Sequence, residues 1–104
     1  MYKYRPGPTF SIINFRNIIV VALNLNEIKW AEDFTEKYWL ELPAQHRQWM
    51  YDFAFARISF EKGEFEKTFQ YLNKINLKEF AFKFDLRTLQ VKLFYETKNI
   101  EGVL

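Results

Sequence analysis

Few side chains in this sequence have the types and spacing that chemistry requires. The single histidine, His46, has no serine, cysteine or carboxylate pattern around it that would make a nucleophilic or acid–base site. Glu61, Glu64 and Glu66 cluster, but a divalent metal needs more ligands at helical spacing, and a solvated turn explains them. The three glycines stand apart, which excludes a phosphate-binding loop, and the chain has no cysteine. We therefore expect no catalysis, no cofactor and no metal.

Binding chemistry has one local signal, at the amino end. Tyr2, Lys3, Tyr4 and Arg5 alternate aromatic and charged side chains, as base stacking and phosphate contacts would require. The whole chain, however, has 15 basic and 13 acidic residues and a net charge of +2, which is little for a nucleic-acid-binding protein. Binding of single-stranded RNA is therefore the alternative function, and a protein or peptide partner is favoured.

The composition predicts one all-α domain. The 104 residues are 49% hydrophobic and 20% aromatic, so the chain folds, and three glycines and three prolines are few for an all-β fold with many turns. The longest apolar run, Ile18 to Leu23, is too short to cross a bilayer, and no signal-peptide pattern opens the chain. We expect a soluble, cytoplasmic protein without membrane contacts.

The clearest elements lie on either side of Gly63. From Trp49 to Phe60 nearly every residue is apolar, which is typical of a helix covered on several sides. A glycine after this run favours a helix stop, because glycine enters the left-handed conformation at little cost. The apolar residues that follow are spaced as on an amphipathic helix: Phe65, Phe69, Leu72 and Ile75. The segment therefore predicts an antiparallel helical hairpin.

The rest of the chain adds three helices to this hairpin. Residues 1–8 contain two prolines and a glycine and are expected to form an extended arm. The β-branched run at 18–21 and the alternation of phenylalanines at 80–84 both fit strands, but we favour helices, with a loop before the last one. The first of the three expected helices begins after a cap at Thr9 or Ser11 and ends near Leu25. The second runs from Glu27 to Leu42. The third runs from about Phe82 to Lys98, with Asn99 as a stop.

Three helix restarts define an internal repeat. Asn26, Gly63 and Lys98 fall in register, 37 and then 35 residues apart, which is typical of helical solenoids. Within the central unit, five positions match the small, glycine, aromatic, small and large positions of a tetratricopeptide repeat: Ala56, Gly63, Phe65, Thr68 and Leu72. The chain thus resembles a tetratricopeptide-like repeat protein, and is similar to the carboxy-terminal part of bacterial proteins of that type. The resemblance implies stacked antiparallel hairpins in a right-handed superhelix of about five helices, with repeats at 9–42, 43–79 and 80–104.

The resemblance also implies where a partner would bind. In this family the first helix of each hairpin lines the concave surface, and by register that surface would carry a weakly basic strip, Arg16, Arg57 and Lys92, beside apolar Met50 and Phe53. Such a strip suits an acidic or carboxylate-bearing peptide. In the competing interpretation Met50 and Phe53 are core residues and Arg57 is a solvated charge.

The end of the chain suggests self-association. Leu86, Leu89 and Leu93 form an apolar stripe on the last full helix, and only Ile100 to Leu104 follow to cover it. Because repeat arrays need polar caps, we expect either a longer protein or a homodimer that buries this stripe. The function expected from the sequence is a non-catalytic protein- or peptide-binding scaffold. The alternatives are an RNA-binding helical repeat and a self-association module of a larger protein.

Overall fold

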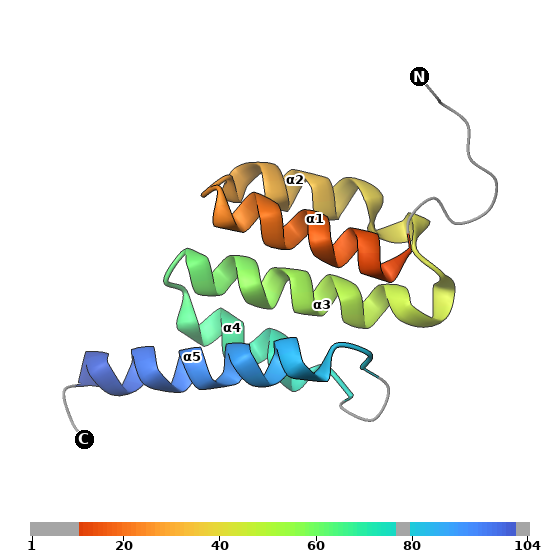
Figure 1. The fold of residues 1–104 in the computed structure, drawn as a ribbon. Helices are drawn as coiled ribbons and strands as arrows, with labels where there is room; N and C mark the ends of the chain where they lie inside the picture. Colours follow the sequence, from red (N-terminus) through yellow and green to blue (C-terminus); the bar gives the residue numbers. More distant parts are fainter. Residues whose placement is uncertain (1–10, 77–79, 102–104) are drawn as a thin grey trace.

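The computed structural model describes residues 11–76 and 80–101, all of them in helices or the connections between helices (Figure 1). The elements are α1 (Ile12–Asn24), α2 (Ile28–Tyr38), a 3₁₀ turn η1 (Trp39–Glu41), α3 (Ala44–Glu61), α4 (Phe65–Asn73) and α5 (Lys83–Glu101). The predicted all-α class with five α-helices is confirmed, and these residues contain no strand. The arm predicted at 1–8 lies outside the described residues. Within the described chain, no helix is long and apolar enough to cross a membrane.

The helices form two antiparallel hairpins and a final single helix. The α1–α2 hairpin stacks on the α3–α4 hairpin, and α5 packs against α3 and α4 (Figure 1). Helix α3 is central because it contacts each of the other four α-helices. The sequence explains this position, since a helix that is apolar around most of its circumference needs neighbours on several sides. Helices α1, α3 and α5 lie side by side and form one face of the stack (Figure 1).

The turns of the two hairpins have the same backbone geometry, 37 residues apart. Asn26 and Gly63 both have a positive φ, 62° and 79°. In each turn the next amide donates to the carbonyl five residues earlier, and the positive-φ residue donates to the carbonyl three residues earlier, which is the Schellman pattern. The four bonds are Glu27 to Ala22 at 2.8 Å, Asn26 to Leu23 at 3.0 Å, Glu64 to Ser59 at 2.9 Å and Gly63 to Phe60 at 3.0 Å. The first two predicted restarts are therefore structurally equivalent.

The third predicted restart is wrong. Helix α5 continues through Lys98 and Asn99 and ends at Glu101, so Asn99 does not stop it. Asparagine tolerates the left-handed conformation but does not impose it, and its cost inside a helix is well below 1 kcal/mol. Asn26 adopts that conformation where α2 folds back onto α1, whereas no helix follows α5 within the described residues. Residues 102–104, assigned to a further outer helix, lie outside the described part.

The leucine stripe of α5 belongs to the core. Leu86, Leu89 and Leu93 are all buried, on a helix that contacts α3 and α4. The expectation that this stripe is an uncovered self-association surface is therefore wrong. The stripe faces the preceding hairpin, and it needs no following helix to cover it. Among the described residues, the face of α5 that lacks a neighbouring helix is the opposite one.

Two buried hydroxyl groups are in contact where α3 and α4 cross. Ser59 Oγ and Thr68 Oγ1 lie 2.9 Å apart, and Ser59 Oγ also donates to the Ala56 carbonyl at 3.0 Å. Both side chains are buried and small enough to let the two helices approach closely. Each hydroxyl also lies within hydrogen-bond distance of a nearby backbone carbonyl, Ser59 of Ala56 and Thr68 of Glu64, so neither lacks a partner. Thr68 thus packs at the α3–α4 contact and adds a hydrogen bond to it.

Candidate functional site

The face formed by α1, α3 and α5 carries a bidentate ion pair. Arg16 in α1 donates from Nε to Asp85 Oδ2 at 2.6 Å and from Nη2 to Asp85 Oδ1 at 2.8 Å. These hydrogen bonds raise the pKa of Arg16. Arg57 in α3 is half-buried between the flanking helices, and burial lowers its pKa, while the charge of Asp85 acts in the opposite direction. The Asp85 carboxylate therefore interacts electrostatically with two guanidinium groups on this face.

The basic strip expected on this face is only partly present. Arg16 and Arg57 do share the face, as the repeat register predicts, but Asp85 neutralises part of their charge. Lys92 is exposed on α5. Met50 and Phe53 are 0% and 2% exposed and belong to the core, so their assignment to a binding surface is wrong and the competing interpretation is correct for both. Register places a residue on one helix, but it does not show that α2 and α4 cover α3 so fully.

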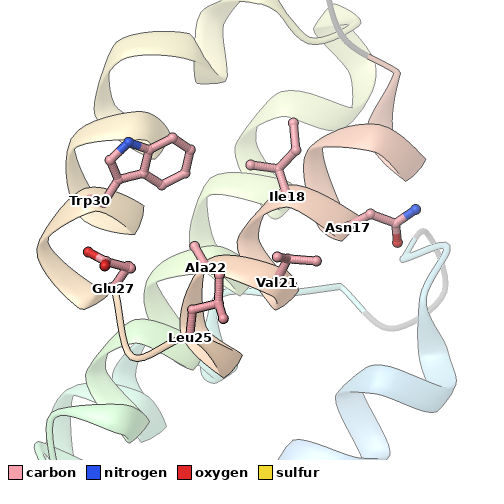
Figure 2. A pocket seen from close by; sticks show the side chains of 7 residues that line it. All are labelled: Asn17, Ile18, Val21, Ala22, Leu25, Glu27 and Trp30. Atoms are coloured by element: carbon pink, nitrogen blue, oxygen red, sulfur yellow. The ribbon is translucent and has the colours of Figure 1, made fainter.

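A larger candidate site is an apolar groove on the α1–α2 hairpin, which we call the amino-end groove (Figure 2). Its volume is about 590 Å³. Trp30 from α2 and Ile18 from α1 face one another across it, and buried Ala22 forms part of its floor (Figure 2). The groove is lined by Asn17, Ile18, Val21, Ala22, Leu25, Glu27 and Trp30. Because its walls are mostly apolar, it suits an apolar surface of another molecule.

Aromatic contacts hold the Trp30 wall of the groove in place. The Trp30 ring stacks on Phe34, with 5.2 Å between ring centres and 9° between ring planes. Phe34 in turn packs against the buried Phe15 of α1 at 5.1 Å. Although the Trp30 side chain is 50% exposed, one side of its ring is therefore fixed to the core. A partner that enters the groove meets a preformed wall, which reduces the entropy cost of binding.

The second exposed apolar surface is the outer side of α5. Phe84, Val91 and Phe94 are exposed and occur at spacings of seven and three, so they lie on one side of the helix, with Tyr95 beside them. Arg87 and Lys98 complete this line. We call Phe84, Arg87, Val91, Phe94 and Lys98 the α5 row. It lies opposite the buried leucine stripe.

Sequence reasoning missed both surfaces. In the amino-end groove, Ile18 and Val21 belong to a β-branched run that is apolar around the helix, so the pattern does not separate buried from exposed positions. In α5, one apolar stripe was expected, whereas the spacing of Phe84, Val91 and Phe94 defines a second stripe. The available signal for the second surface was a helix at the end of the stack that is apolar on two opposite sides, since only one side can face the stack.

Other expected features give no site in the described residues. The ring of His46 packs against Trp49, with 5.1 Å between the ring centres. No group of three or more metal-ligating side chains occurs within 11–76 and 80–101. The aromatic and basic residues of the RNA hypothesis, Tyr2 to Arg5, lie outside these ranges. Comparison with known family models, with curated proteins and with solved structures finds no match to this chain.

Proposed function

We propose that this chain is a non-catalytic protein-binding module, a tetratricopeptide-like right-handed stack of helical hairpins that recognises its partner through the amino-end groove. The observation that carries the proposal is the groove itself, an apolar hollow of about 590 Å³ on the outer side of the first hairpin. Two hairpin turns with the same hydrogen-bond pattern and a positive φ support the repeat architecture. The proposal replaces the concave strip as the main binding surface, because Met50 and Phe53 are buried and Asp85 neutralises part of the strip.

The chemistry of the groove favours an amphipathic helix as its ligand. Within the chain, each hairpin is covered by a helix that contacts both of its members: α3 covers α1 and α2, and α5 covers α3 and α4. The amino-end groove also lies between α1 and α2, and most of the residues that line it are apolar. A helix with apolar residues at i, i+3, i+4 and i+7 inserts these into such a groove, as in other helix-in-groove complexes.

The test uses a photo-crosslinking amino acid at Val21, which lines the groove, and at Gln70, which is exposed on α4. In a nuclease-treated lysate of the source organism, we expect the Val21 probe to form a defined protein adduct that is absent with the Gln70 probe. In parallel, partner binding should shift the emission of Trp30 to shorter wavelength, because it buries an indole that is half exposed.

Three results would contradict this function. Equal adducts at Val21 and Gln70 would mean nonspecific capture. Loss of the Val21 adduct in Lys92→Glu, with its retention in the groove variant Leu25→Glu, would return the site to the face of α1, α3 and α5. Binding that disappears with nuclease would favour the RNA hypothesis. Because both Lys92 and Leu25 are exposed, neither substitution disturbs the core.

A further inference from the structure

We propose that the helix recognised by the amino-end groove is α5 of a second copy of this chain, so that copies associate head to tail. This inference rests on the proposed binding role of the groove and names its partner. The two surfaces lie at opposite ends of the stack: the groove on the first hairpin, and the α5 row on the last helix (Figure 1). One surface is hollow and the other is a ridge.

The α5 row has the pattern that a helix-accepting groove requires. Its five residues follow spacings of three, four, three and four, and they extend over about 21 Å of helix at 1.5 Å per residue. Phe84 is 82% exposed and Phe94 is 64% exposed, so two aromatic rings project from the row. Aromatic side chains of this kind dominate the affinity of protein interfaces.

The charges of the two surfaces are complementary. Glu27 is the charged residue that lines the groove. The charged residues of the α5 row are both cationic, Arg87 and Lys98, and the other exposed charges on the described part of α5, Lys83 and Lys92, are cationic as well. Pairing of α5 with the groove brings these opposite charges together. Pairing of α5 with the α5 of another copy brings like charges together and is disfavoured.

The symmetry of the contact determines the assembly. The groove and the α5 row are different surfaces, so the contact is heterologous, and each bound pair of copies leaves one groove and one row free. A dimer is therefore not the end state of the wild-type chain. Association continues to longer assemblies as the concentration rises, unless the rotation between copies closes a ring.

The decisive experiment measures mass by sedimentation for two single variants and their mixture. Val21→Glu places a charge in the groove, Phe94→Glu places one in the α5 row, and Gln70→Glu on α4 is the matched control. We expect the wild type and the control to exceed the mass of a dimer at high micromolar concentration. Each variant alone should remain a monomer. An equimolar mixture of the two should give a dimer and nothing larger, because only one intact groove and one intact row are present.

A charge-reversal experiment tests the orientation of the contact. Glu27→Lys should weaken association up to about fivefold, as expected for loss of an exposed ion pair. Adding Arg87→Glu and Lys98→Glu to the same chain should restore association. Higher salt should reduce both the weakening by Glu27→Lys and its reversal. If the triple variant associates no better than Glu27→Lys, the proposed pairing of these charges is wrong.

Other outcomes would overturn the proposal and separate it from the proposed function. If the wild type is a monomer at all concentrations and Val21 forms an adduct with a different protein, the groove remains a binding site but a second copy is excluded as its partner. A dimer abolished by Phe94→Glu but not by Val21→Glu would be a symmetric α5 contact. Association that requires nucleic acid, and ends with nuclease, would assign the α5 row to nucleic-acid binding. A wild-type monomer without any adduct at Val21 would overturn both proposals.

Discussion

Arg16 and Asp85 are 69 residues apart in the chain, yet they form a bidentate ion pair that connects α1 to α5 across α3, with distances of 2.6 and 2.8 Å. The pair joins the first hairpin directly to the last helix, on the face where α1, α3 and α5 lie side by side (Figure 1). Its side chains are 30% and 12% exposed, so water screens it only in part. Arg57 is affected by the charges of both partners.

Removal of either partner should destabilise the fold, and Asp85→Ala should cost more than Arg16→Ala. Without Asp85, Arg16 and Arg57 repel one another, whereas without Arg16 the carboxylate still interacts with Arg57. A double-mutant cycle by urea denaturation should give a coupling energy of about 1 kcal/mol. Lys92→Ala, an exposed change on the same helix, is the control and should have little effect. Equal costs for the two single variants would contradict the role given to Asp85.

The Schellman turns predict opposite effects for two substitutions. Gly63 has φ of 79°, and no atom lies within 4 Å of an added Cβ, so Gly63→Ala should cost about 1 kcal/mol through backbone strain alone. Asn26 holds the same conformation with φ of 62°, and Asn26→Gly should raise stability by a few tenths of a kcal/mol. Thermal unfolding of the two variants measures both. A neutral Gly63→Ala would mean that the turn relaxes to a negative φ.

The sequence predicted those parts of the fold that depend on local chemistry. Ser11 caps α1, as one of two proposed residues, by accepting a hydrogen bond from the Asn14 amide at 3.0 Å. Gly63 follows the end of α3, as expected. The predicted end of α5 was wrong because Asn99 has no strong conformational preference of its own. Whether the helix stops at Asn99 therefore depends on what packs beyond it.

The sequence could not predict the site, because the site depends on distances between helices. Arg16 and Arg57 interact electrostatically on one face, but the pairing of Arg16 with Asp85 needs the approach of α1 to α5. Similarly, Leu93 and Phe94 are equally apolar neighbours, and only the position of α5 against α3 and α4 makes one buried and the other exposed. Hydrophobic periodicity shows that a helix has an apolar side, not which of two apolar sides meets a neighbour.

The buried hydroxyl pair at the α3–α4 crossing should be coupled. Ser59→Ala removes the 2.9 Å contact with Thr68 and should cost about 1 kcal/mol. The double variant Ser59→Ala with Thr68→Ala should cost less than the sum of the two single changes, because each single change already removes the contact between the two hydroxyls. Thr88→Ala is a matched control, since the Thr88 hydroxyl also donates to a carbonyl of its own helix but is exposed. Strict additivity would show that the two hydroxyls act separately.

Asp52 should make stability depend on pH in mildly acidic solution. Its side chain is buried in α3, and burial raises its pKa above the usual 3.8, although a hydrogen bond from Gln48 at 3.4 Å opposes this. The folded protein therefore binds the Asp52 proton more tightly than the unfolded chain does. It follows that the Asp52 contribution to stability is unfavourable at neutral pH and is relieved as the pH falls through the folded-state pKa.

Asp52→Asn should consequently stabilise the protein at neutral pH, and this gain over the wild type should shrink as the pH falls towards 4. Parallel urea denaturation of both proteins across this range measures the difference. Gln48→Ala, which removes the hydrogen bond that lowers the pKa, should raise the pKa of Asp52 further, and carbon NMR of the carboxyl group reports it. A gain that grows as the pH falls would reverse the sign and show that Asp52 is stabilised in its charged form, with the interaction with Lys74 outweighing burial.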